Sequence, residues 1–167
     1  MELSLLNELE LEELIVEANS NDNINFLNEV FLDKKVADIK KITDFDKWNY
    51  LHRILCYFNP SVELVRFYIS NGLDVNAQDK YGMTPLHYAM RAKNVDAAIA
   101  LLNAGADPNI PNQDNLIPLR MCKGYSLLID RNRKNPKEYQ DTQRINGIDF
   151  HYYIDSENKG VTNVHPK

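Results

Sequence analysis

The chain has little cysteine, little glycine and no long apolar run. Its two cysteines, Cys56 and Cys122, lack CxxC spacing, so we expect no disulfide framework or zinc ribbon, and both thiols should stay reduced in the cytoplasm. The six glycines form no phosphate-binding loop. We expect no signal peptide, because the N-terminus has no basic residues, and no apolar stretch is long enough to span a bilayer.

Positive charge is absent from residues 1–33, which hold nine acidic side chains, and the formal net charge of the chain is −5. This balance disfavours general nucleic-acid binding. The glutamates between residues 8 and 17 have two interpretations. They form either the solvated face of a terminal helix or an electrostatic docking surface for a basic protein, which would raise the association rate.

Motifs that carry catalysis or metal binding are also missing. His151 and His165 are isolated, without the spacing of metal ligands. Cys56 has no base that the sequence would place beside it, and core packing explains it better. We therefore predict no catalytic, cofactor-binding or metal-binding residues and no cofactor.

A repeat of 33 residues is the most informative feature that the chain does have. Gly72 recurs as Gly105, and Pro85 recurs as Pro118. Residues 84–89 read Thr-Pro-Leu-His-Tyr-Ala. This period and this hexapeptide resemble those of ankyrin repeats.

The resemblance implies an all-α fold, a stack of antiparallel helix pairs joined by protruding hairpin fingers. We expect an N-terminal helical cap over residues 1–35 and ankyrin-like repeats over 36–131, divided at about 36–73, 74–106 and 107–131. We expect the extension, residues 132–167, to be irregular, although partial alternation over 148–154 allows a short strand.

Two histidines follow the leucine of the repeat motif, His52 and His87. The resemblance implies that both are structural and form hydrogen bonds between the loops of neighbouring repeats. The distance from Asp38 to His52 is one residue longer than that from Asp74 to His87. We therefore expect one extra residue in the first finger.

Trp48 has two interpretations of equal weight. On an exposed finger it would be a natural interface anchor, because an aromatic ring buries much area at little entropic cost. Alternatively, the irregular first finger folds back and the indole fills a gap in the core.

The resemblance also implies that a partner protein is bound by the fingers and by the concave face of the inner helices. The predicted partner-binding residues lie on the three fingers and on the inner-helix side of the three repeats. They are Phe45, Asp46, Trp48, Tyr57, Gln78, Lys80, Tyr81, Met83, Arg91, Gln113, Asp114, Asn115 and Lys123.

The sequence thus predicts a cytoplasmic, non-catalytic module, monomeric when free, that binds one folded protein 1:1. A short acidic ankyrin-like chain resembles immunity proteins of bacterial toxin–immunity pairs, so the partner could be a toxin domain. The alternative is a scaffold or a host-directed effector that binds a host protein. Two further classes are disfavoured, nucleic-acid binding and an enzyme whose site in 132–167 uses His151, Tyr152 or Asp155.

Overall fold

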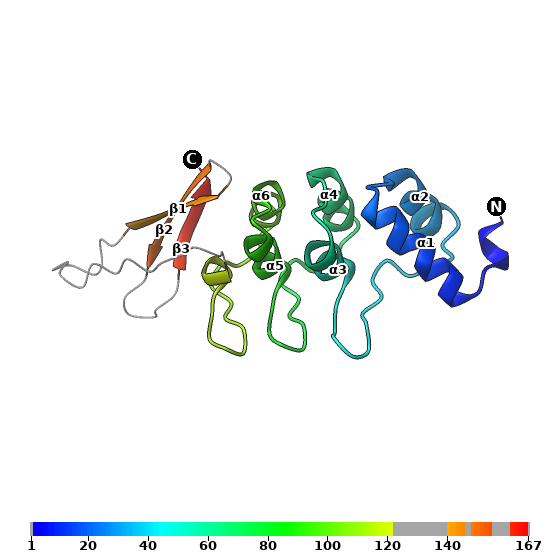
Figure 1. Ribbon diagram of the computed structural model, residues 1–167, viewed down its shortest axis with the longest axis horizontal. Coiled ribbons are helices and arrows are strands. Elements are labelled where there is room, and N and C mark those ends of the chain that lie inside the picture. The colour runs from blue at the N-terminus through cyan, green and yellow to red at the C-terminus, as the bar shows by residue number, and fades with distance from the viewer. Residues whose placement is uncertain (1, 122–139, 146–147, 155–160, 167) are drawn as a thin grey trace.

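The computed structural model describes residues 2–121, 140–145, 148–154 and 161–166. Its helices lie in pairs along one axis, with α3 and α5 in one row, α4 and α6 in the other, and loops projecting beyond the first row (Figure 1). The helices are η1 (Leu3–Leu5), α1 (Glu8–Ser20), α2 (Ile24–Asn28), η2 (Glu29–Asp33), α3 (Tyr50–Tyr57), α4 (Val62–Ser70), α5 (Pro85–Ala92), α6 (Val95–Asn103) and η3 (Pro118–Met121). None of the helices in the described residues is both long and apolar enough to cross a membrane.

Short polar side chains decide where the helices of the repeats begin. Asn49, Ser61 and Asn94 precede α3, α4 and α6, and each accepts a first-turn backbone N–H at 3.0–3.2 Å. Pro85 takes the first position of α5, where its missing N–H removes no helical hydrogen bond. Thr84 is the N-cap residue of α5, and its hydroxyl lies 2.9 Å from Nδ1 of His87, one turn later.

One apolar cluster runs through the described helices, from the N-terminal pair to η3. Leu27, Leu51, Leu64, Leu86 and Leu101 are among its buried members. Helices α1 and α2, with α2 continued by the π-helical turn η2, share this core. A helix pair that cannot bury its apolar face alone gains the missing half from its neighbour, which is the physical basis of a stack.

The repeat boundaries require two glycines. Gly72 follows α4 with φ of +80°, and Gly105 follows α6 with φ of +91°. Only glycine adopts these values without steric cost, and the turn that it allows sends the chain out of the outer helix and into the next finger.

The third unit is less regular than the second. After its finger the chain forms only the four-residue 3₁₀ helix η3, where a complete inner helix would continue the pattern. The second helix expected near residues 125–131 lies outside the described residues.

The C-terminal extension was expected to be irregular apart from the strand allowed over 148–154, and its described residues form that strand and two more. Strands β1 (Gln140–Ile145), β2 (Ile148–Ile154) and β3 (Val161–Pro166) form an antiparallel sheet in the order β1-β2-β3. Thr142 pairs with His151, and Phe150 pairs with Pro166. Only β2 has apolar alternation in its sequence. β1 and β3 are largely polar, and backbone hydrogen bonds to β2 stabilise them as strands.

Candidate protein-interaction surface

The three fingers, residues 43–48, 79–83 and 112–116, share one internal geometry. A short polar side chain opens each finger and accepts the backbone N–H of its last residue. Asp79 accepts from Met83 at 2.8 Å, and Asn112 accepts from Leu116 at 2.9 Å. In the first finger the Thr43 hydroxyl accepts from Trp48, at 2.9 Å, across one more residue. The expected insertion therefore lies within the first finger.

Each turn is closed by a left-handed residue just before the end of the finger. These residues are Lys47, Gly82 and Asn115, with φ of +59°, +74° and +61°. Glycine and asparagine adopt this conformation readily, whereas a lysine pays a steric cost. The first finger is thus the most strained of the three.

The two repeat histidines connect successive fingers, as the resemblance implied. Nε2 of His52 lies 3.1 Å from the carbonyl oxygen of Met83, and Nε2 of His87 lies 2.9 Å from that of Leu116. Nδ1 of each ring faces the backbone N–H of the residue before its helix, so the proton belongs on Nε2, which donates to the next finger. Burial lowers the pKa of both imidazoles, which keeps them neutral.

Backbone hydrogen bonds also run from fingertip to fingertip. The N–H of Lys80 donates to the carbonyl of Asp46, and the N–H of Gln113 donates to the carbonyl of Tyr81, both at 2.9 Å. The side-chain amide of Gln113 adds a bond to the Lys80 carbonyl at 2.6 Å. The fingers form one connected ridge, so side chains on it have a fixed spacing.

Two exposed aromatic rings and an ion pair lie together on this ridge. Phe45 is 78% exposed and Tyr81 is 51% exposed. Nζ of Lys80 lies 3.3 Å from the ring centroid of Phe45, 4.9 Å from that of Tyr81, and 2.7 Å from the carboxylate of Asp46. We call Phe45, Asp46, Lys80 and Tyr81 the tip cluster. Its lysine holds both rings in place through cation–π contacts.

The inner helices α3 and α5 contribute a second aromatic and cationic group. Tyr57 is 66% exposed, and its ring meets that of Trp48 edge-on, with centroids 5.4 Å apart. The guanidinium of Arg91 lies 4.6 Å from the ring centroid of Tyr88, and its Nη2 is 3.4 Å from Sγ of Cys56. Tyr57 and Arg91 are thus exposed side chains resting on buried aromatic neighbours.

Two of the predicted surface residues are buried. Trp48 is 9% exposed, and its indole N–H donates to Asp79 at 3.0 Å; Met83 is 5% exposed. The prediction of an exposed Trp48 was therefore wrong, and the buried indole of its alternative is confirmed, although the first finger does not fold back but joins the ridge. The indole lies inward, as does Met83 at the same end of the second finger, and a carboxylate satisfies its one donor.

Three of the other predicted residues lie on or beside the ridge. Gln78 is exposed but donates its amide to the carbonyls of Gly82 and Pro111, so it braces the ridge. Asp114 and Asn115 are exposed on the third finger. Lys123 lies outside the described residues.

Asp79 is a residue that the sequence analysis missed. Its carboxylate is nearly buried and accepts four hydrogen bonds, from the indole of Trp48, the hydroxyl of Tyr88, and the backbone N–H groups of Tyr81 and Met83. Asp79 therefore holds the backbone turn of the second finger and also anchors the indole at the end of the first finger. A signal existed, because an acceptor of the same size, Asn112, recurs 33 residues later.

A family model described as ankyrin repeats (3 copies) matches residues 14–112. This is more than half of the chain, which therefore belongs to the ankyrin-repeat family, a class of proteins that generally mediates protein–protein interaction. The match starts inside residues 1–35, which the sequence analysis placed outside the family pattern. The family pattern thus includes part of α1.

Named relatives agree with this assignment. The ankyrin repeat protein nuc-2 of Neurospora crassa is 37% identical over 91 residues, which are 54% of this chain and 8% of that protein. An L-asparaginase of Dirofilaria immitis is 35% identical over 85 residues, 50% of this chain and 14% of that protein. The chain therefore spans a small part of these relatives.

The fold also matches a solved structure. The ankyrin repeat domain of Bcl-3, a member of the IkappaB protein family, superposes with a TM-score of 0.50 and 26% sequence identity. The match covers 57% of this chain and 40% of that one. The predicted stack of helix pairs is thereby confirmed.

Proposed function

We propose that this chain is a non-catalytic module that binds one folded protein through the tip cluster and the adjoining concave face. The observation that carries the proposal is the fixed pair of exposed rings, Phe45 and Tyr81, on a hydrogen-bonded ridge. Isolated exposed apolar residues are ordinary, but two rings locked around one lysine form a preorganised contact.

Preorganisation is what makes this surface suited to binding. Both rings are already restrained by Lys80, so little side-chain entropy remains to be lost when a partner covers them. Tyr57 and Arg91 extend the same chemistry onto the inner helices. Aromatic residues and arginine are the residue types that most often dominate binding energy, and a standard interface needs about 800 Å² per partner.

The specific form of this function that we propose is immunity, in which the partner is a bacterial toxin domain bound 1:1 in the cytoplasm. It is supported by the resemblance of an acidic ankyrin-like chain to such proteins and by the acidic α1, whose charge would speed association with a basic partner. The alternative is a scaffold or a host-directed effector, which would bind a host protein and would need no toxin gene beside its own.

The test of the binding surface uses Phe45→Ala and Tyr81→Ala. Proteins captured by the wild-type chain from its native cell would be identified, and the affinity of the purified partner would then be measured by calorimetry. Loss of about 1–3 kcal/mol per ring, roughly 5- to 150-fold in Kd, is expected. Leu9→Ala is the matched control, because Leu9 is 78% exposed on α1, away from the fingers.

Each part of these proposals has an outcome that would decide against it. Full affinity in the Phe45→Ala, Tyr81→Ala double variant would exclude the tip cluster as the binding surface. For immunity, the chain would be co-expressed with the toxin candidate encoded beside it. If the double variant protects the cell as well as the wild type does, protection does not depend on binding through the fingers. Capture of a host protein with no adjacent toxin gene would favour the alternative.

A further inference from the structure

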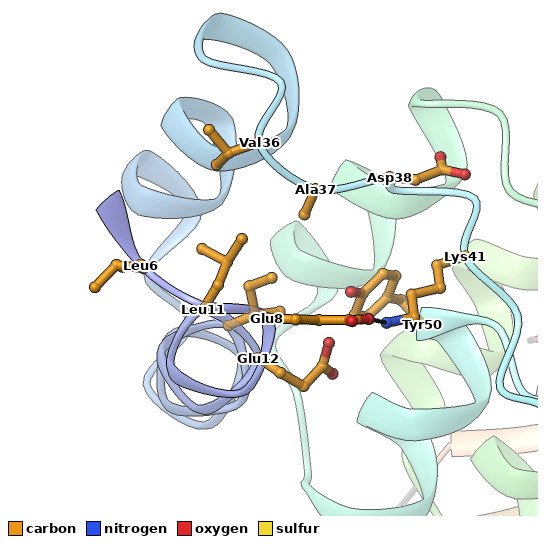
Figure 2. Close-up of a pocket in the computed structure, with 10 residues that line it drawn as sticks. Leu6, Glu8, Leu11, Glu12, Val36, Ala37, Asp38, Lys41 and Tyr50 are labelled. Carbon is orange, nitrogen blue, oxygen red and sulfur yellow. Dashed lines mark hydrogen bonds and ion pairs between the residues drawn. The ribbon is translucent and has the colours of Figure 1, made fainter. Parts of the chain in front are cut away.

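A cavity of about 370 Å³ lies near the N-terminal end of the stack, between α1 and the segment that precedes the first finger (Figure 2). Its size falls within the usual range for small-molecule sites, about 300–1,000 Å³. It is lined by Leu6, Glu8, Leu11, Glu12, Ile15, Val36, Ala37, Asp38, Lys41 and Tyr50. None of these residues belongs to the tip cluster, so the cavity is a separate feature of the molecule.

The cavity combines an apolar interior with negative charge. Leu11 of α1 lies across from Val36 (Figure 2), and Ile15 of the same helix also lines the cavity. Three carboxylates line the cavity against the single ammonium of Lys41, and an excess of negative charge remains even when Arg53, which is paired with Glu12, is counted. An anionic ligand would be repelled, whereas a cation with an apolar body would match both features.

The charged side chains of the rim are exposed enough to rearrange. Nζ of Lys41 lies 2.7 Å from the carboxylate of Glu8, and the two side chains are 45% and 83% exposed. A surface ion pair of this kind contributes little to stability. It can therefore open and let the segment carrying Lys41 move slightly away from α1.

Tyr50 supplies the observation that points to a ligand. The residue is 1% exposed, its hydroxyl makes no hydrogen bond among the described residues, and the guanidinium of Arg53 lies 5.0 Å from its ring centroid. Figure 2 shows this hydroxyl directed toward the space between Leu11 and Ala37. The ring is fixed by stacking on Tyr68, with centroids 5.3 Å apart, so the hydroxyl cannot turn toward solvent. A buried polar group left unpaired is rare and calls for a partner.

We infer that this cavity binds a small organic cation, a protonated amine on a short apolar chain. Its ammonium group donates to the Tyr50 hydroxyl and to the carboxylate of Glu8, while Glu12 stays paired with Arg53, and its hydrocarbon chain lies against Leu11 and Ile15. The same chemistry is available from a free amine or from the lysine side chain of a peptide. The site is independent of the proposed protein-binding surface, so either can fail without the other.

Three probes with one hydrocarbon chain and different head groups test the charge requirement. The full chain would be titrated with n-hexylammonium, n-hexanol and hexanoate while backbone amide shifts of residues 36–41 are followed by NMR. Hexylammonium should bind with a Kd on the order of 1 mM, hexanol more weakly, and hexanoate not at all. A tripeptide Gly-Lys-Gly with blocked ends, titrated in parallel, distinguishes a lysine side chain from a free amine.

Two variants test the residues. Tyr50→Phe should weaken hexylammonium binding about five-fold, since it removes one hydrogen bond. Glu8→Gln should weaken it by a similar factor, and it acts at an exposed side chain, so the fold is preserved. Glu13→Gln makes the same charge change on the exposed face of α1 outside the cavity and should leave the Kd unchanged.

The inference is overturned by any of three results. Absence of hexylammonium binding would mean that the cavity holds water alone. Equal binding of hexanoate would remove the charge argument. Equal weakening by Glu13→Gln and Glu8→Gln would mean that the acidic helix attracts amines without a defined site.

Discussion

Asp79 connects two fingers and an inner helix, so replacing it with asparagine is a sharp test of how the ridge is held. The substitution keeps the shape and removes the charge. An amide oxygen at this position can still accept the backbone N–H groups of Tyr81 and Met83, as Asn112 does for the equivalent amides of the third finger. The new NH₂ group then takes the place of the oxygen that accepts from Trp48 and Tyr88.

The cost follows from what that NH₂ group meets. The indole N–H of Trp48, 3.0 Å from the present oxygen, is a donor and would face another donor. One charge-assisted hydrogen bond, worth about 1.5–3 kcal/mol, is lost. The Tyr88 hydroxyl, now at 2.6 Å, can turn and accept, but only in a neutral bond. We expect Asp79→Asn to lower the free energy of unfolding by about 2–4 kcal/mol.

Urea unfolding at pH 7 measures this difference, with a double-mutant cycle as the control. Trp48→Phe removes the indole donor, so Asp79→Asn should cost about 1–2 kcal/mol less in that background. A cost below about 1 kcal/mol in the wild-type chain would refute the reasoning. So would an equal cost in both backgrounds, because the coupling between Trp48 and Asp79 would then be absent.

The pH dependence of folding stability provides an independent test of the same carboxylate. Burial alone would raise the pKa of Asp79, but the hydrogen bonds from Tyr88, Trp48 and the backbone N–H groups of Met83 and Tyr81 outweigh it and hold the pKa below its ordinary 3.8. A carboxyl with a folded-state pKa below its unfolded value contributes stability that is full above the unfolded pKa and is lost as pH falls through the folded one. The Asp79→Asn variant should lack this part of the acid-induced loss below about pH 4.

Two further predictions concern the repeat itself. Burial lowers the pKa of His52 and His87 below the usual 6.5, so the urea midpoint should be constant above pH 7 and fall toward pH 5; a midpoint that rises on acidification would contradict this. Gly82→Ala should cost more than Gly105→Ala in thermal unfolding, because both have positive φ but only the Cβ at Gly82 would meet backbone, that of Asn112 and its successor, at 3.1–3.3 Å. Equal losses of about 1 kcal/mol would mean that this contact relaxes without cost.

The repeat pattern in the sequence predicted much of the fold. Pro85 and the two terminating glycines, Gly72 and Gly105, mark helix boundaries because their backbone chemistry is local. The pattern also assigned the histidines correctly, and the insertion before His52 was visible from spacing alone. It did not reveal β1, whose polar sequence has no periodicity of its own.

The candidate surface was only partly predictable, and Trp48 and Asp79 show why. Nothing local says whether an indole beside a turn points outward or inward. That choice depends on a carboxylate 31 residues away, which accepts its N–H. Lys80 likewise looks like one more solvated lysine until the stack brings Phe45 and Asp46 against it.

The sequence by itself determined the repeating helix pairs, their boundaries and the existence of fingers, because caps, glycines and apolar spacing act within a few residues along the chain. Only the tertiary structure decided which aromatic rings are exposed, which polar groups are paired, and that the Tyr50 hydroxyl makes no hydrogen bond within the described part of the chain. These outcomes depend on contacts between residues of different repeats, and such contacts are set by how one unit stacks on the next.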